Sequence, residues 1–464
     1  MAVQCSPGQL QAGAARVDIT PPMGTQLAGM IGMYRPAETL LDPVHASVLV
    51  LASGDTRLCL LSLEILAVAD DWVGRIRHEA RERFGLQPEA VMVHAVQNHA
   101  APMIGARMDA ELCDWLPENG RWLLNDAGEY NPYAVERIMQ GIQHALDALT
   151  PVRMGMGRGM DNRVAFNRRY VMRDGTTVTQ PSAAQFKDIL HSEGPIDPEV
   201  GVVCFTSASL KRVAMLLHHT CHPVHGVSGR HISAGWPGAW RKEVEAAHGQ
   251  GCVPLVVNGC CGNVHHRNHL DPDQRDEPGR IGRLLAETTQ RALQGLTYTN
   301  EVPLAARSVR VPIPHRQVSP EDLQEAKDLL ARHPEPMWKN EEHTSVDWAW
   351  CYATSVLDVH ALAQRSPQYP YEVQAFRIGD VAIVALTGEP FVQGGLRLKL
   401  ESPAPYAFPA HMSNGYCGYL PTPGSFGRGG YETKTALWSR LAPEALDTVI
   451  DAAVELVGEM YENS

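Results

Sequence analysis

VMVHAVQNHAAP, residues 91–102, begins as an apolar run and ends in polar side chains. Its Val, Met and Ala residues predict a short buried strand. Gln97, Asn98 and His99 follow, and polar groups at the end of a buried strand are costly to bury unless they have partners. Open α/β sheets bind ligands at the carboxyl ends of their strands. We therefore expect an α/β fold in which this stretch carries Gln97 and His99 into a binding site.

The rest of the chain supports an α/β fold. Further strand-like runs cover residues 44–53, 57–68, 200–207, 212–220, 253–259, 302–313 and 372–388, the last with a hairpin signal at 378–380. Apolar residues at helical spacing cover residues 70–84, 134–149, 279–295, 319–333 and 442–461. We expect mixed β-sheets flanked by helices in a single domain, residues 1–464, with a soft boundary between lobes 1–298 and 299–464.

The composition argues against several classes of protein. The 464 residues carry a formal net charge of −12, which disfavours nucleic acid or an anionic membrane as a partner. No apolar run is long enough to span a bilayer, and the first residues lack the basic and apolar regions of a signal peptide. The ten cysteines are mostly scattered, as in proteins with reduced thiols. We expect a cytoplasmic protein that acts on a small molecule; whether it forms a homo-oligomer stays open.

Histidines gather where strands are predicted to end. Five occur in HHTCHPVHGVSGRH, residues 218–231, and three in NGCCGNVHHRNH, residues 258–269, while His99 follows a third strand. Imidazole is the commonest metal ligand in proteins and titrates near neutral pH. A single loop histidine is usually just solvated, but three clusters at three strand ends favour one shared pocket. Glu389, in TGEPF after another apolar run, is either an ordinary salt-bridge partner or a metal ligand or acid/base group.

A series of motifs resembles one known family along nearly the whole chain. They are AGAARVDITPPMG (12–24), LDPVHASVLVL (41–51), VMVHAVQNHAAP (91–102), NRRY (167–170), GPIDPEVGVVCF (194–205), CHPVHG (221–226), NGCCGNVHH (258–266), TGEPFVQGGLRLK (387–399) and SNGYCGYLPTPGSFGRGGYE (413–432). In this order they are similar to the zinc-dependent catalytic domain of the neutral/alkaline non-lysosomal ceramidase family. The fold implied is that catalytic domain without the β-rich C-terminal domain of the ceramide-cleaving members.

The resemblance implies a set of site residues. His222, Glu389 and Tyr419 match metal-ligand positions of a zinc site, Tyr431 matches a second active-site tyrosine, and Arg168 matches a substrate-binding arginine. Zinc accepts nitrogen and oxygen ligands and keeps one position open for water. Such a metal polarises a carbonyl and generates a nucleophile at neutral pH. Asn263 and His225, in two of the same motifs, are expected near the substrate.

Two positions depart from the family pattern. The first histidine of the family's H-T-H-S-G-P stretch is replaced by Gln97, which leaves His99. Because strand residues two apart share a face, we expect His99 to take over as metal ligand and catalytic residue, with Gln97 near the substrate or offering a weaker amide oxygen. The family's catalytic serine is replaced by His265, which we expect to act as a general acid/base or as a replacement ligand.

These residues favour a metal-dependent hydrolase, most simply a zinc enzyme that cleaves an amide or ester bond in a small polar substrate by metal-activated water. One alternative is a metal-assisted lyase or isomerase in which His265 or Tyr431 moves protons. Another is a metal- or ligand-binding protein without turnover. We expect His218 and His219 outside the metal site and Cys260-Cys261 packed beneath a turn. The aromatic cluster Trp348, Trp350 and Tyr352 should begin a helix as core or as a lid.

Overall fold

Two β-sheets stacked face to face form the centre of the molecule. The computed structural model describes residues 8–106, 118–249, 251–271, 273, 274 and 277–461. The larger sheet has the order β14-β12-β11-β6-β1-β3-β4-β5, with β16 beside β6, and the smaller has the order β17-β18-β19-β21. Both sheets are mixed: β4 with β5, β12 with β14 and β19 with β21 are parallel pairs, and their other paired strands are antiparallel.

The strands of the larger sheet are β1 (Gln11–Asp18), β3 (His45–Ser53), β4 (Thr56–Leu63), β5 (Val91–Ala95), β6 (Thr150–Met160), β11 (Glu199–Ser207), β12 (Arg212–His219), β14 (Val253–Asn258) and β16 (Tyr298–Thr299). Those of the smaller sheet are β17 (Leu304–Pro314), β18 (Gln368–Ile378), β19 (Val381–Leu386) and β21 (Tyr406–Ala410). The remaining pairings join β10 (Ile189–Ser192), β8 (Arg169–Met172) and β9 (Thr177–Thr179); β13 (His231–Ile232) and β2 (Thr39–Leu40); β15 (Val264–His265) and β7 (Phe166–Asn167); and β20 (Glu389–Pro390) and β22 (Tyr419–Leu420).

Helices cover the outer face of each sheet. The larger sheet is covered by α1 (Asp70–Phe84), α2 (Tyr130–Asp147), α3 (Gly235–His248) and α4 (Pro278–Ala292), and the smaller by α7 (Val392–Glu401) and α9 (Ala445–Tyr461). The core between the sheets contains Leu49, Phe205 and Leu255 from one and Phe376 and Ile383 from the other. The architecture is therefore four layers, helix, sheet, sheet, helix, and the expected mixed α/β fold is confirmed.

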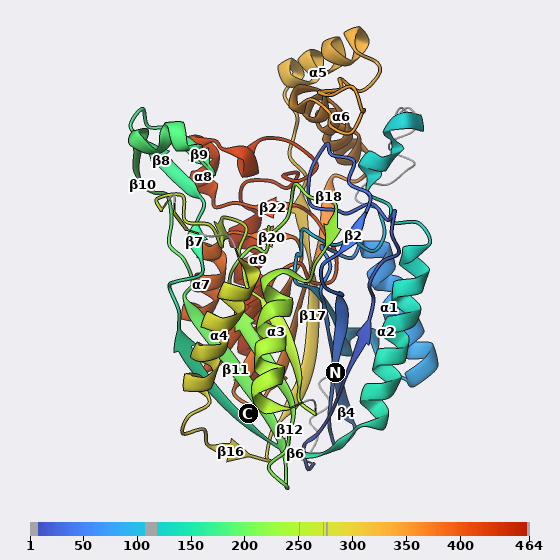
Figure 1. Cartoon of the computed structure of the whole chain (residues 1–464), viewed down its shortest axis with the longest axis vertical. Helices are drawn as coiled ribbons and strands as arrows, with labels where there is room; N and C mark the ends of the chain where they lie inside the picture. The colour runs from blue at the N-terminus through green and yellow to red at the C-terminus, as the bar shows by residue number, and fades with distance from the viewer. Residues whose placement is uncertain (1–7, 107–117, 250, 272, 275–276, 462–464) are drawn as a thin grey trace.

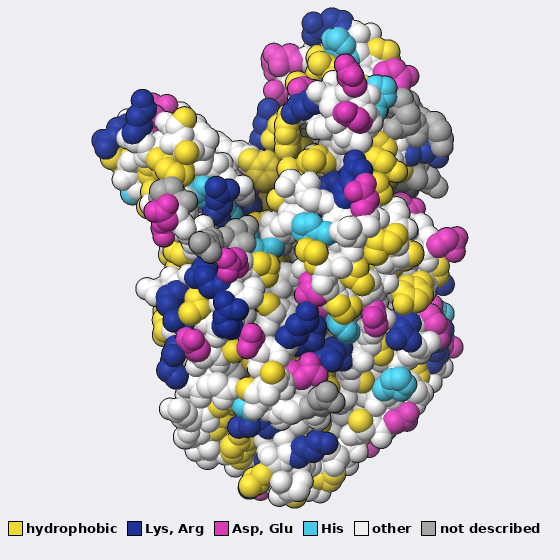
Figure 2. All heavy atoms as spheres, in the orientation of Figure 1, with side chains coloured by type: hydrophobic (Ala, Val, Ile, Leu, Met, Phe, Trp, Pro, Cys, Tyr) yellow, Lys and Arg dark blue, Asp and Glu magenta, His cyan; other side chains and the backbone are white. Residues whose placement is uncertain are grey.

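Two projections rise from one end of the molecule. One holds α5 (Pro320–Arg332) and α6 (Trp348–Arg365), and the other holds β8, β9, β10 and the short helix α8 (Pro423–Arg428) (Figure 1). In the space-filling view they stand on either side of a hollow (Figure 2). Short 3-10 turns occur at Pro88–Ala90, Glu118–Leu124, Ala183–Asp188 and Tyr431–Thr433. No helix in the described part of the chain is long and apolar enough to cross a membrane.

Most predicted elements are present, and the hairpin signal at 378–380 lies in the tight turn between β18 and β19. The predicted strand 57–68 ends earlier, at Leu63. Strands β1 and β6 and helices α3 and α7 are not foreseen by the sequence patterns. Trp348 does begin a helix, α6, as expected.

A buried ion pair fixes the end of β4. The Glu64 carboxylate accepts a hydrogen bond from Arg241 Nε at 2.7 Å and lies 3.2 Å from His45 Nδ1. Burial alone would raise the pKa of Glu64, but the Arg241 guanidinium and hydrogen bonds from His45 and Arg241 outweigh it and lower the pKa to about 2. This pair ties α3 to the strand end that precedes the site.

Replacing Glu64 with Gln should lower the free energy of unfolding at pH 7 by about 3 kcal/mol, because the buried Arg241 guanidinium loses its main counter-charge. Since the folded pKa of about 2 lies below the ordinary 4.5, the contribution is complete above pH 4.5 and is lost as the pH falls towards 2. Urea unfolding of wild type and Glu64→Gln should therefore converge over that range. Glu79→Gln, which removes pairs with Arg75 and Arg83 near the surface, should change the stability by less than about 1 kcal/mol.

Candidate active site

Polar residues that follow β5 and β19 meet a tyrosine of β22 in one cavity. The chain reaches Gln97 and His99 after β5 and Glu389 after β19, while Tyr419 begins β22. The pairing of β20 with β22 places Glu389 directly beside Tyr419. These four side chains, with Tyr416 and Tyr431, line a cavity of about 450 Å³ of empty space, open solvent at its mouth included. Its other walls are largely apolar and include Leu66, Met103 and Met412.

The loop after β5 reaches the cavity by a turn. Gln97 has φ = 68°, in the left-handed region that costs free energy for a residue with a side chain. We expected Gln97 and His99 to share a face because both would lie on one strand. That reason is wrong, because β5 ends at Ala95 and neither residue belongs to it. Both residues still line the cavity.

Asn98 holds this loop in place. Its Nδ2 donates to the carbonyl oxygens of Glu64 at 3.1 Å and Ser233 at 2.5 Å, and its Oδ1 accepts from the backbone N–H of Ala100 at 3.1 Å. The Asn98 side chain is fully buried. It thus joins three segments and fixes the position from which His99 enters the cavity.

His99 and His222 face one another with their Nε2 atoms 2.7 Å apart. Burial lowers the pKa of His99 to about 3 and lowers the pKa of His222 well below its ordinary value, so both rings are neutral at pH 7. In this arrangement one Nε2 carries the proton and the other accepts it with its lone pair, so the two nitrogens share one hydrogen bond. A neutral imidazole nitrogen is also the donor that divalent zinc takes from histidine.

Glu389 is the buried carboxylate of the cavity. Its Oε1 accepts from Tyr416 Oη at 3.0 Å, while its Oε2 makes no hydrogen bond of normal geometry with the described residues. Burial raises the pKa of Glu389, opposed by the charge of Arg168 and by the nearby Tyr419 and Gln97 side chains. On the other side, Gln97 Oε1 accepts a weak hydrogen bond from the Cys261 thiol at 3.6 Å.

Arg168 lies behind Tyr419 and is only 2% exposed. Its Nη2 donates to Tyr419 Oη at 3.0 Å and to the Gly262 carbonyl at 2.6 Å, and its Nε donates to Glu432 at 3.1 Å. Burial raises the pKa of Tyr419 well above its ordinary value, and the Arg168 charge opposes that rise. The structure thus brings Arg168 to the tyrosine, and it is outside the set of residues that line the cavity.

Three other expected site residues lie near the cavity without lining it. His265 is buried beside His222, with which it forms a backbone bridge, and its ring stacks on that of His269. The His225 ring stacks on the His266 ring at a centroid distance of 3.7 Å. Asn263 uses both ends of its amide, donating to Gln393 and accepting from the backbone of Val392, so it anchors the start of α7.

The residues expected to be structural lie as follows. His218 and His219 hydrogen-bond to the carbonyls of Pro409 and Glu199, away from the cavity. The eight described cysteines are buried, Cys260 and Cys261 among them. The Trp348 ring contacts Tyr431 and Trp438 edge-on.

Sequence reasoning missed Tyr416, Asn98 and the thiol of Cys261 as supports of the site. Tyr416 stands three residues before Tyr419 in the motif SNGYCGYLPTP. Nothing in the neighbouring sequence indicates that Tyr416 as well as Tyr419 reaches the cavity. Asn98 could have been found, because a buried asparagine directly before a site histidine needs partners for both ends of its amide.

The donors in this cavity suit a divalent metal chemically, although no three His, Cys, Asp or Glu side chains converge on one point among the residues described. Two imidazole nitrogens already face each other, and Glu389 offers a buried oxygen without a hydrogen bond of normal geometry. A phenol oxygen, Tyr419 Oη, lines the same cavity. His99, Glu389 and Tyr419 line the cavity, whereas His222 lies outside its lining and faces His99.

Comparison with known proteins places the fold. No protein-family model and no curated protein sequence matches this chain. The solved structure of neutral ceramidase from Pseudomonas aeruginosa superimposes with a TM-score of 0.74 at 15% sequence identity, over 99% of this chain and 75% of that chain. This chain has the fold of neutral ceramidase. A structure described as ceramidase complexed with C2 gives a TM-score of 0.72 at 15% identity, over 98% of this chain and 76% of the other.

At this identity the likeness shows the fold alone. The fold that the motif resemblance implies is confirmed. The same motifs form the strand ends and turns around the cavity. The chemistry must be argued from the side chains present here, above all from Gln97 and His265, where this chain departs from the family pattern, and from His99, which it retains.

The strained backbone at Gln97 can be tested by two substitutions. Gln97→Gly relieves the left-handed strain while losing the buried amide, so the free energy of unfolding should stay within about 1 kcal/mol of wild type. Gln97→Val places a β-branched side chain at φ = 68° and should destabilise by about 2 kcal/mol or more. Chemical unfolding measures both. Equal losses in the two variants would show that side-chain contacts, and not the backbone, dominate at this position.

Proposed function

We propose that this chain hydrolyses an amide or ester bond in a small substrate, with a divalent metal, zinc first among them, as cofactor. His99 and His222 would hold the ion, and Glu389 and Tyr419 would complete its ligands. The observation that carries the proposal is the pair of neutral imidazoles facing each other at 2.7 Å beside a buried carboxylate. The two facing Nε2 atoms hydrogen-bond to each other, whereas the buried Glu389 Oε2 has no hydrogen bond of normal geometry with the described residues, and this oxygen in the same cavity as His99 supports a cation site.

When bound, such a metal supplies Lewis acidity at a carbonyl and a nucleophile at neutral pH. The chain's own residues prepare the rest of the site. Tyr416 donates to Glu389 and fixes its orientation, and Arg168 donates to Tyr419 Oη and favours the phenolate. Tyr431 lines the cavity and its ring packs edge-on against that of Tyr419. Its hydroxyl is the group that would donate to the carbonyl oxygen or to the leaving group.

The shared fold supports hydrolysis as the reaction class, because the proteins of that fold found by comparison are named as ceramidases. The cavity argues for a smaller substrate than a long-chain lipid. It has about 450 Å³ of empty space, and the six side chains Gln97, His99, Glu389, Tyr416, Tyr419 and Tyr431 give it a polar half. A small polar amide or ester matches this balance of polar and apolar wall.

A metal-assisted lyase or isomerase is the second candidate, favoured by one observation: Tyr431 lines the cavity with a titratable hydroxyl. His265, the other expected proton carrier, lies outside the cavity lining and is 1% exposed. From this position we infer that His265 supports the backbone segment that carries His222.

His222→Ala should remove both the metal and the activity while the fold survives. One of two facing nitrogen ligands is lost, and the core is formed by the sheets and helices elsewhere. Metal content by plasma emission spectroscopy, hydrolysis of a panel of small N-acyl and ester compounds, and circular dichroism check the three parts. His144→Ala, on the exposed face of α2, is the control and should change none of them. Full turnover by metal-free His222→Ala would contradict the metal mechanism.

Substitutions of Tyr431 and His265 separate the two candidates for proton transfer. Tyr431→Phe should lower kcat by about 10²–10⁴-fold with metal still bound if its hydroxyl transfers a proton, the range for a general acid/base. His265→Ala should lower kcat less than about ten-fold if the residue only supports His222. If His265→Ala instead lowers kcat by about 10²–10⁴-fold while the metal stays bound, His265 is a proton carrier.

A further inference from the structure

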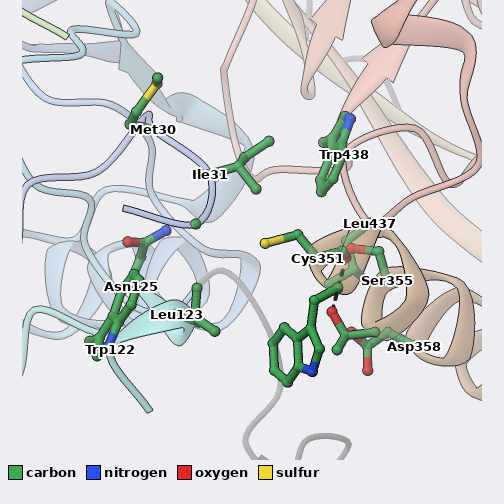
Figure 3. Close-up of a pocket in the computed structure, with 13 residues that line it drawn as sticks. Met30, Ile31, Trp122, Leu123, Asn125, Cys351, Ser355, Asp358, Leu437 and Trp438 are labelled. Carbon is green, nitrogen blue, oxygen red and sulfur yellow. Dashed lines mark hydrogen bonds between the residues drawn. The ribbon is translucent and has the colours of Figure 1, made fainter. Parts of the chain in front are cut away.

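A second cavity adjoins the candidate active site. It lies between the loop at Met30–Gly32, the turn at Trp122–Asn125, helix α6 and Leu437–Trp438, and it encloses about 480 Å³ of empty space, solvent at its mouth included. Figure 3 shows Ile31 and Trp438 on one side, Leu123 and Asn125 on another, and Cys351, Ser355 and Asp358 coming from α6.

The two cavities share part of their walls. Ile31, Asn125 and Trp438 line both. The Trp438 ring also stacks on Tyr431, with centroids 6.0 Å apart and planes inclined at 23°. A group in the second cavity would therefore be separated from Tyr431, which lines the first cavity, by the Trp438 ring.

Three indole rings stand among the apolar walls of the second cavity. Trp122, Trp350 and Trp438 contribute to it. Trp122 is held by stacking on Trp338, and Trp350 by a hydrogen bond from its Nε1 to the His333 carbonyl at 3.0 Å. Flat, fixed indole faces favour a ring over a flexible chain, because aromatic pairs gain attraction beyond the buried area.

Polar groups close the α6 side. Thr354, Ser355 and Asp358 line it, and Asp358 is 2% exposed. Thr354 Oγ1 donates a hydrogen bond to the Cys351 carbonyl oxygen at 2.9 Å. A long alkyl chain that continued in this direction would meet these polar side chains, beside which apolar surface is unfavourable. The walls and this end together select a short, neutral, ring-bearing group.

We propose that this second cavity is a specificity subsite that binds a neutral aromatic ring carried by the substrate whose amide or ester bond lies in the first cavity. The proposal rests on the proposed hydrolase function for the position of the scissile bond, while ring binding can be measured without turnover. The substrate class it names is a small N-acyl or ester compound with one aromatic ring close to the reacting carbonyl.

The test compares amides that differ in one arm. Acetylglycine has no apolar arm, octanoylglycine has a linear chain, and phenylacetylglycine carries the same number of acyl carbons as a ring; N-acetylbenzylamine puts the ring on the amine side. For wild type we expect kcat/KM for the better ring compound to exceed that for acetylglycine and octanoylglycine at least ten-fold. The ring compound should also change the tryptophan fluorescence.

Ser355→Phe fills the second cavity from α6, at a position that lines the second cavity and not the first. It should reduce the ring preference to about two-fold or less and abolish ring binding, while kcat/KM for acetylglycine stays the same. Gln364→Phe makes the same change at an exposed position of α6 and should keep the preference. Trp122→Ala, which removes one half-buried wall, serves if Ser355→Phe does not fold, and it too should lose the preference.

The outcomes separate the two proposals. Ring binding that is lost in Ser355→Phe without hydrolysis of any compound would uphold the subsite and overturn the hydrolase. Hydrolysis with equal rates for ring and chain, or a ring preference unchanged in Ser355→Phe and Trp122→Ala, would overturn the subsite alone. Absence of both binding and hydrolysis for both ring compounds would overturn it as well.

Discussion

The buried guanidinium of Arg168 is the interaction on which the site depends. A charge withdrawn from water costs several kcal/mol unless its partners are exact in position. Arg168 meets this demand by joining the Gly262 carbonyl, Tyr419 and Glu432, three segments far apart in the chain. Glu432 in turn binds Arg169, which also pairs with Glu193, so two cations and two carboxylates balance within the buried network. The strand ends are therefore held together by charge neutralisation, and Tyr419 is fixed by the same arginine.

Burial then sets the charge of the two imidazoles, the carboxylate and the buried phenol of the site. It lowers the pKa of His99 and His222, so both rings are neutral, and it raises the pKa of Glu389 and Tyr419, which makes both poor anions by themselves. Arg168 supplies one positive charge behind them. A second, divalent charge in front would make both anions favourable at neutral pH, since an opposite charge at close range outweighs desolvation. Neutral nitrogen donors and latent oxygen anions are thus complementary to a cation.

The sequence revealed the strands that end at the site because those strands are apolar and their ends are polar. It did not reveal β1 and β6, and the reason is packing. A Cβ on Gly13 would lie 2.0 Å from the Ala145 carbonyl oxygen of α2, and one on Gly157 would lie 2.1 Å from the Ala292 carbonyl oxygen of α4. Helices approach these strands so closely that glycine replaces the β-branched residues by which strands are recognised. The aromatic wall around Trp438 was equally hidden, because residues near 31, 122, 350 and 438 meet only in the folded chain.

The site differs from the family pattern at Gln97, which stands where that pattern has its first histidine. Its Oε1 accepts from the Cys261 thiol, which leaves the amide nitrogen for the Glu389 side chain that lies beside it. An amide oriented in this way lies between the Cys261 thiol and the Glu389 carboxylate, and the thiol occupies one of its two oxygen lone pairs. The left-handed φ of 68° is the turn of the chain at which Gln97 takes this position. Gln97 is then a support for Glu389, and the imidazole that faces His222 has to come from His99, two residues further along the same loop.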